Sequence, residues 1–490
     1  MDPLGTITQY FPFIEMKTKS VLERIMRESS DYYDFVHRLG DLVLNENPPI
    51  MVVYFSIHHC ILAQEYPIID MIREKYGENQ LILCPNLFIS SAFQGTYEDV
   101  KRVHEMADAI LATNPEDWIA LEMNFMKFEA DMRNYPTTIY QQSTMDRIRE
   151  LIDSNPDFGY YEIVLNDYLG TRALTDGDSE ERLRCTERGL HFAEKFDDRL
   201  RLAHLLMRKA HITMNQNTKK SKELLEQAYS VVDTSLGIPS YYADILYNLS
   251  MLDAIRGEFD SAIKRCLQAV NFRERAGLDS GNASYFLALF YNIVGEAESG
   301  LEWGQMAEDQ LKNRPYLINR AILNQIWSLI LLKRLTEAQV LLDSVRESIM
   351  KSGDEKQLAW LHYVTGALEI EQGEYSLALS SIEQALRIIE KQQSAYMMEL
   401  FFLHQLAMIE VSTSPSDEII SPSLAILEDK ALSEDLPGIL GQVLLLKAEI
   451  AIVDNDEAVL REIVSQLRLL TENENLRFLK TPFDVLLSKI

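Results

Sequence analysis

Residues 366–389 read GALEIEQGEYSLALSSIEQALRII. Gly373 stands between an apolar-rich segment and a second segment in which apolar residues recur at the helical period. Glycine adopts the left-handed conformation that ends many helices without the steric penalty of a Cβ atom. The stretch therefore predicts two short helices joined by a glycine turn, the second with an apolar stripe at Leu377, Ala378, Ile382, Ala385, Leu386 and Ile389.

The same spacing recurs along the chain. Counted from the turn glycine, position +2 carries an aromatic or small residue. Positions +5 and +12 each carry a small residue. The copies are Gly373 with Tyr375, Ala378 and Ala385; Gly257 with Phe259, Ala262 and Ala269; Gly295 with Ala297, Gly300 and Ala307; and Gly95 with Tyr97, Val100 and Ala107. A fifth copy has Leu335 and Ala338, but Lys333 replaces the glycine. Four of the +5 positions (262, 300, 338 and 378) follow one another at intervals of 38, 38 and 40 residues, which indicates a structural repeat.

Small residues at +5 and +12 allow two helices to pack closely, and the aromatic residue fills the wedge where they diverge. Small residues also lie twelve positions before the +5 site, at Ser250, Ala288 and Gly366. Together these positions resemble the tetratricopeptide repeat, with copies of about 38–42 residues instead of the usual 34. Pro115 and Pro156 resemble the proline that ends such repeats.

The resemblance implies an all-α fold, a right-handed α-solenoid of about ten stacked antiparallel helix pairs. We predict four regions along the 490 residues. Residues 1–80 form a weakly matched N-terminal cap, and 81–235 form degenerate repeats. Residues 236–392 form the best-matched repeats, and 393–490 form further degenerate repeats with C-terminal capping helices.

The chain is strongly acidic, with a formal net charge of −28. Such an excess repels phosphate backbones and anionic membranes, so nucleic acid and lipid are poor partners. The charge either keeps a long surface soluble or attracts a basic protein or peptide. Four widely spaced cysteines, without a CxxC pair, are typical of buried thiols in a reducing compartment. The N-terminal residues lack the pattern of a signal peptide, so we expect a cytoplasmic protein.

Motifs for catalysis or metal binding are not convincing. His58 and His59 are adjacent and point about 100° apart on a helix, so they cannot converge on one ion. His104-Glu105 begins like HExxH, but Asp108 stands where the second histidine is required. The acidic run 176–181 lacks the spacing of an EF-hand and predicts a turn with a helix N-cap. We therefore predict no enzymatic activity, no cofactor and no metal site.

Two functions agree with a helical repeat. The first is an interaction scaffold whose concave groove binds a peptide or helix of a partner protein. The alternative is a sensor that binds a small effector or signal peptide and acts through a separate partner. Chaperone-binding tetratricopeptide domains resemble one another in a clamp of Lys, Asn and Arg side chains that grips a C-terminal carboxylate. Asn248, Asn324 and Arg320 could supply part of it, but no lysine matches, so chaperone binding is not expected.

The repeat phase also predicts the partner-binding residues. Position 5 of each first helix should face the groove, and it carries Tyr247, Tyr285, Leu323 and Tyr363. Tyrosine offers a large contact area and a polar group for a peptide backbone. The alternative is that these rings only pack between neighbouring helices. The predicted site consists of Asp244, Tyr247, Asn248, Asn282, Tyr285, Arg320, Asn324, Trp360 and Tyr363.

Overall fold

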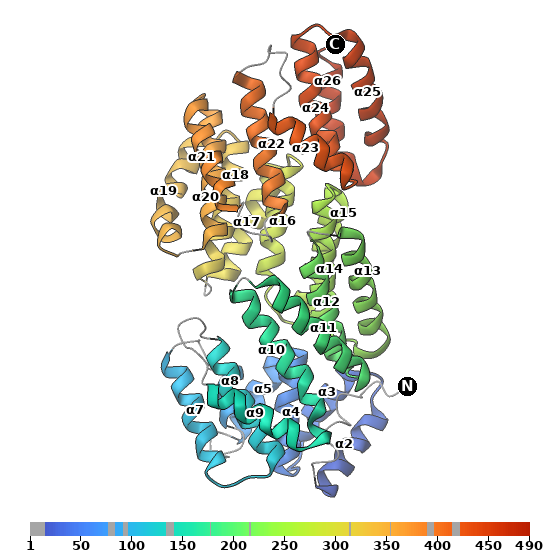
Figure 1. The fold of residues 1–490 in the computed structure, drawn as a ribbon, viewed down its shortest axis with the longest axis vertical. Coiled ribbons are helices and arrows are strands. Elements are labelled where there is room, and N and C mark those ends of the chain that lie inside the picture. The colour runs from blue at the N-terminus through green and yellow to red at the C-terminus, as the bar shows by residue number, and fades with distance from the viewer. Residues whose placement is uncertain are drawn as a thin grey trace. The chain divides into compact units, whose positions relative to one another are not determined.

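The computed structural model describes residues 15–76, 84–91, 97–133, 142–176, 178–214, 217–312, 315–352, 354–389, 396–413 and 422–490. Within these ranges every regular element is a helix, and none is a strand (Figure 1). The chain divides into two compact units, Met1–Tyr242 and Ala243–Ile490, here called the first and the second unit. The four-region division remains a prediction.

The first unit contains, in chain order, α2 (Met16–Glu28), α3 (Tyr32–Asn45), α4 (Ile50–Ala63), α5 (Tyr66–Tyr76), α6 (Cys84–Ser91), α7 (Tyr97–Leu111), α8 (Asp117–Arg133), α9 (Gln142–Ser154), the 3-10 helix η3 (Pro156–Tyr160), α10 (Tyr161–Asp176), α11 (Ser179–Lys195), α12 (Arg199–Thr213), α13 (Thr218–Val231) and the π-helical turn η4 (Val232–Leu236). Helix α14 (Pro239–Ile255) begins in this unit and continues into the second.

The second unit continues with α15 (Phe259–Arg275), α16 (Gly281–Ile293), α17 (Ala297–Leu311), α18 (Pro315–Leu331), α19 (Leu335–Ser352), α20 (Glu355–Glu371), α21 (Tyr375–Ile389), α22 (Tyr396–Thr413), α23 (Pro422–Ser433), α24 (Pro437–Val453), α25 (Glu457–Thr471), the 3-10 helix η5 (Glu474–Leu479) and α26 (Lys480–Leu487).

Consecutive helices pack as antiparallel pairs, and the even-numbered helices also pack on one another. In the second unit α16 contacts α18, α18 contacts α20, and α20 contacts α22, while in the first unit α4, α6, α8 and α10 contact in the same way. The even-numbered helices therefore form one layer of each unit, here called the inner layer, and the odd-numbered helices cover it. The predicted all-α, tetratricopeptide-like solenoid of stacked helix pairs is confirmed.

The predicted turns have the expected backbone. Gly257, Gly295 and Gly373 have positive φ angles of 75°, 83° and 78°. Lys333 has φ 59°, so the copy that lacks glycine keeps the left-handed turn despite the Cβ atom. Gly95, the turn of the upstream copy, lies outside the described residues. In the acidic run, the side chain of Asp178 caps α11 by accepting a hydrogen bond from the backbone N–H of Glu181 (2.9 Å), as predicted.

The small residues of the repeat lie in the core. At the +5 and +12 positions of the described copies, the alanines are fully buried: Ala262, Ala269, Ala307, Ala338, Ala378 and Ala385. Buried aromatic side chains lie beside them, such as Phe259 at the start of α15 and Phe290 in α16. The core of the second unit thus follows the spacing that the sequence predicts.

We expect Ala262→Leu or Ala378→Leu to lower the free energy of unfolding by about 1–3 kcal/mol, because added methylene groups strain a close helix contact. Urea unfolding of the full chain measures the change. Ala458→Leu is the matched control, because Ala458 is an exposed residue of α25 and its replacement adds no strain. If either core variant kept the wild-type unfolding midpoint, the repeat phase would be wrong.

The end of the second unit packs against its beginning. Helix α15 contacts η5, and the ring of Phe259 meets the ring of Phe478 edge-on at a centroid distance of 5.2 Å. The backbone N–H of Gly438, in the first turn of α24, donates a hydrogen bond to the carbonyl of Arg256 (3.2 Å). This contact joins segments about 180 residues apart and closes the second unit on itself.

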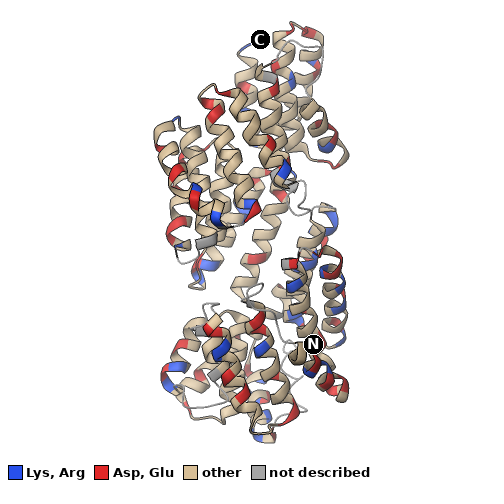
Figure 2. Cartoon of the chain, turned by 60° about the vertical axis from the view of Figure 1, so that its left-hand side comes forward, with Lys and Arg blue, Asp and Glu red and all other residues tan. Residues whose placement is uncertain are grey.

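Acidic residues are distributed over the helices of both units, and basic residues are interspersed among them (Figure 2). No helix in the described ranges is long and apolar enough to cross a membrane. Burial raises the pKa of the Cys60 and Cys266 thiols to about 12 and that of Cys185 to about 11. The side chain of Cys84 lies outside the described residues. The three described thiols are therefore protonated and unreactive at neutral pH.

Candidate functional site

The predicted binding residues all lie on inner-layer helices of the second unit, namely α14, α16, α18 and α20. Their exposure differs from helix to helix. Asn282 is exposed; Asp244, Tyr247, Asn248, Tyr285 and Arg320 are half-buried; Asn324, Trp360 and Tyr363 are buried. The structure thus brings the nine residues onto one layer, and the accessible ones are those on α14 and α16 together with Arg320 on α18.

Tyr247 and Tyr285 occupy the same position on consecutive inner helices. Both rings contact Phe286, at centroid distances of 5.1 Å and 4.4 Å. Burial is the main cause that raises the pKa of Tyr247, so its phenol is neutral at physiological pH. Each tyrosine therefore contacts Phe286 in an edge-type arrangement and keeps another part of its ring open to solvent.

Trp360 and Tyr363 lie in an aromatic cluster. Their rings stack at 4.6 Å with an interplanar angle of 7°, and Tyr363 stacks on Phe402 at 5.3 Å. Trp327 meets the edge of Tyr363 at 5.4 Å. Tyr363 is only 7% exposed and Trp360 only 8%. Burial of this kind agrees with the packing alternative at these two positions.

Charged groups at the site are held by neighbours. Asp244 forms an ion pair with Arg273 of α15 (3.2 Å), and its carbonyl accepts a hydrogen bond from the Asn248 amide (2.7 Å). Arg320 forms an ion pair with Asp354, the N-cap residue of α20 (3.4 Å). These contacts fix the positions of the charged side chains beside Tyr247 and Tyr285.

The side-chain amide of Asn324 is oriented by the hydrogen bond that its NH2 group donates. Its Nδ2 donates to the backbone carbonyl of Tyr285 (3.0 Å). The backbone carbonyl of Asn324 accepts hydrogen bonds from the side chains of Asn292 and Ser328 (3.0 Å each). The remaining side-chain atom, Oδ1, is buried and has no hydrogen-bond partner within the described ranges. A buried acceptor without a donor costs about 1–3 kcal/mol, so this atom requires an explanation.

Two further polar atoms of the inner layer are also buried without a hydrogen-bond partner among the described residues. Trp360 Nε1, on α20, is a buried donor without an acceptor, and Gln405 Oε1, on α22, is a buried acceptor without a donor in the part of the chain described. Because α18 packs on α20 and α20 on α22, these atoms and Asn324 Oδ1 follow the inner layer across three helices. Sequence reasoning missed Gln405, because the repeat spacing is lost beyond residue 392 and gives no register for α22.

No protein-family model matches this chain, and no curated protein sequence matches it. Among solved structures, it is similar to a Rap protein complexed with competence and sporulation factor, with a TM-score of 0.45 and 13% identity over 67% of this chain and 98% of that one. It is also similar to NprR in complex with its cognate peptide NprX (TM-score 0.48, 13% identity, 69% and 97%) and to yeast Tom70 (TM-score 0.34, 11% identity, 89% and 94%). These similarities concern the arrangement of helices.

Proposed function

We propose that this protein is a non-catalytic interaction scaffold that binds an extended peptide or a helix of a partner protein along the inner layer of its second unit. The observation that carries the proposal is the partial exposure of Tyr247 and Tyr285 on consecutive inner helices. Tyrosine supplies apolar area at small entropic cost and a hydroxyl for a peptide backbone. The exposed Asn282 and the braced Asp244 and Arg320 add polar contacts around the two rings.

The buried atoms without partners support an extended peptide. A peptide backbone offers N–H donors and carbonyl acceptors in alternation, and Asn324 Oδ1, Trp360 Nε1 and Gln405 Oε1 need one or the other. A peptide that reached them would part the side chains now covering these atoms. Each hydrogen bond formed would remove the cost of an unsatisfied group, which compensates for that opening.

The test begins with selection of peptides from a displayed random library on the full-length chain. We expect Tyr285→Ala to weaken the selected peptide about tenfold or more while the melting temperature changes little, because the exposed part of the ring then binds the peptide. The matched control is Tyr375→Ala, since Tyr375 lies on the outer helix α21 and is 36% exposed. The Tyr375→Ala variant should bind the selected peptide with the affinity of the wild type.

Gln405→Met provides the second arm. Methionine has nearly the volume of glutamine and lacks the unsatisfied oxygen, so the variant should be at least as stable as the wild type. It should nonetheless bind the selected peptide more weakly. The proposal is wrong if the library yields no binder. It is also wrong if Tyr285→Ala lowers stability by about 2 kcal/mol or more and leaves affinity unchanged, because that result indicates packing alone.

A further inference from the structure

The inner layer of the first unit encloses a cavity of about 180 Å³. It lies among α4, α6, α8, α10 and α12, and its chemistry is set by Glu122, Phe125, Glu129, Tyr161, Tyr168 and Arg201. Sites for drug-sized ligands usually measure about 300–1,000 Å³, so this cavity suits a smaller molecule. Aliphatic side chains make up most of its remaining wall.

Two carboxylate–tyrosine pairs line the cavity in register. Tyr161 donates a hydrogen bond to Glu122 Oε1 (2.7 Å), and Tyr168 donates one to Glu129 Oε2 (2.6 Å). The two glutamates are seven residues apart on α8, and the two tyrosines are seven residues apart on α10. Seven residues correspond to two helical turns, so each pair lies on one helix face. The carboxylates therefore stand at two levels along the same wall.

Phe125 lies between these levels on α8. Its ring stacks on Tyr161 at a centroid distance of 5.6 Å and an angle of 17°, and it is tilted against Tyr168 at 6.3 Å. Aromatic faces carry negative electrostatic potential and attract cations, while their area binds alkyl chains. The wall between the two carboxylates is thus suited to an aliphatic chain with charged ends.

The Glu122 carboxylate lies buried in the wall of the cavity. It is 7% exposed and accepts a second hydrogen bond, from Tyr54 (2.9 Å), but it forms no ion pair within the described ranges. Burial raises the pKa of Glu122, and the hydrogen bonds from Tyr161 and Tyr54 lower it only in part. Two neutral hydroxyl groups orient the carboxylate without neutralising it, and a buried charge is costly unless it is paired.

The basic groups at the cavity do not supply that partner. Arg201 forms an ion pair with Asp198 (3.2 Å), a fully buried carboxylate, although its charge also acts on Glu122 from a distance. Burial lowers the pKa of His58 to about 3, so this ring is neutral at physiological pH. Among the described residues, neither group therefore forms an ion pair with Glu122.

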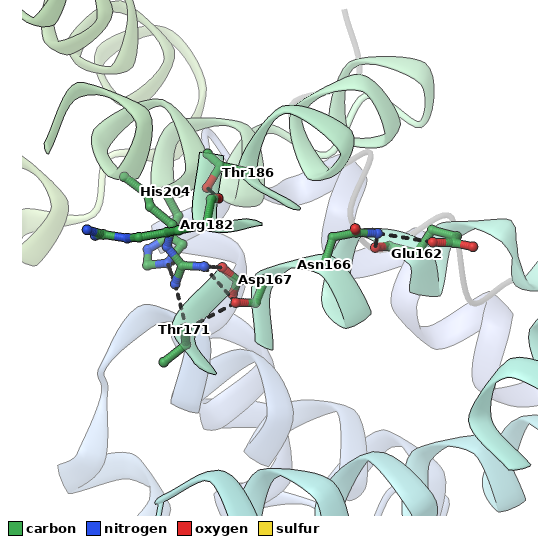
Figure 3. Close-up of polar contacts among 8 residues, drawn as sticks. Glu162, Asn166, Asp167, Thr171, Arg182, Thr186 and His204 are labelled. Atoms are coloured by element: carbon green, nitrogen blue, oxygen red, sulfur yellow. Dashed lines mark hydrogen bonds and ion pairs between the residues drawn. The ribbon is translucent and has the colours of Figure 1, made fainter. Parts of the chain in front are cut away.

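A polar cluster beside Tyr168 brings together side chains of α10, α11 and α12, among them Asp167 and His204 (Figure 3). Asp167, adjacent to Tyr168 on α10, contacts Arg208 Nη1 at 2.7 Å and His204 Nε2 at 3.5 Å. Burial alone would raise the pKa of Asp167, but the charges of Arg208 and His204 outweigh burial and hold it below its usual range. Arg208 and His204 thus pair with Asp167, and neither forms an ion pair with Glu122 among the described residues.

We propose that the cavity of the first unit binds a linear aliphatic diamine or polyamine, with one ammonium group at Glu122, a second at Glu129, and the alkyl chain along Phe125. Seven helical residues rise about 10.5 Å, a distance that a chain of several methylene groups with two ammonium ends can bridge. The tyrosine hydroxyls hold both carboxylates in place for the ligand. This inference does not rest on the proposed function, because it concerns the other unit.

Isothermal titration of the full-length chain with 1,6-diaminohexane and spermidine tests the proposal. We expect both amines to bind. Hexylamine should bind at least tenfold more weakly, because its single ammonium group reaches only one carboxylate, and 1,6-hexanediol should not bind. Nα-acetyl-lysine methylamide distinguishes a free diamine from a lysine side chain of a protein. It presents one ammonium group and should bind no better than hexylamine.

Variants assign the contacts. Glu122→Gln and Glu129→Gln should each weaken diamine binding tenfold or more, whereas Glu150→Gln, on the exposed face of α9, should leave it unchanged. Because Glu129 is half-buried, its replacement remains informative if Glu122→Gln fails to fold. The proposal is overturned if no amine binds, if hexylamine matches the diamine, or if Glu129→Gln binds like the wild type.

Discussion

Replacing Gly257 with alanine is expected to lower the free energy of unfolding of the second unit by about 2–5 kcal/mol. Two costs add at this turn. Gly257 has φ 75°, where a Cβ atom costs roughly 1–2 kcal/mol. The new Cβ would also lie 2.5 Å from Gly438 Cα and 2.9 Å from the backbone nitrogen of Ile439. These are backbone atoms, so no side chain can rotate away and α24 must move.

Gly295→Ala separates the two costs. Gly295 occupies the same turn one repeat later, with φ 83°, and no heavy atom lies within 4 Å of the added Cβ. Its replacement should cost only the roughly 1–2 kcal/mol of the left-handed backbone. Urea unfolding followed by tryptophan fluorescence measures both, since Trp303, Trp327 and Trp360 all lie in the second unit. Equal losses in the two variants would show that the contact with Gly438 does not form.

The local fold could be predicted from the sequence, because its causes lie within one repeat. Turn glycines and buried alanines depend on residues at most twelve positions apart, so their spacing alone predicts the helix pairs. Lys333 shows why a missing glycine did not break the pattern. The left-handed turn costs a lysine only about 1–2 kcal/mol, which the surrounding helix contacts offset.

Long-range contacts could not be predicted in this way. The approach of Gly257 to Gly438 and of Phe259 to Phe478 depends on how successive repeats rotate against one another. That rotation is the sum of small differences in packing between neighbouring repeats. The repeat phase placed Trp360 and Tyr363 on the inner layer. Their burial by Phe402 comes from α22, where the spacing had already been lost.

The cavity of the first unit left a signal that the sequence analysis missed. Glu122 and Glu129 are seven residues apart, and Tyr161 and Tyr168 repeat that interval 39 residues later. A separation of 39 residues is one repeat length, so an inner helix and the next inner helix carry matching pairs at the same level. Charged and aromatic residues at one register position in consecutive repeats therefore indicate a contact even where the turn glycine is missing.

Trp360→Ala is expected to lower the free energy of unfolding by about 3–5 kcal/mol, because it leaves a cavity in the core of the second unit. The indole is 8% exposed, stacks on Tyr363 and Phe402, and meets Trp327 at 5.8 Å. None of these rings can fill the space without giving up its own packing. Urea unfolding of the full-length chain gives the value.

Trp360→Phe distinguishes the two roles of this side chain. Phenylalanine keeps an aromatic ring in the stack and lacks the Nε1–H group, which has no acceptor among the described residues. The smaller ring loses some contact area, but removal of an unsatisfied donor offsets part of that loss, so we expect a cost of about 1 kcal/mol or less. If the N–H group serves a bound peptide, affinity falls although stability is nearly unchanged. If Trp360→Phe instead destabilises the chain as much as Trp360→Ala, the N–H group already has a partner within the fold. It would then be unavailable to a ligand.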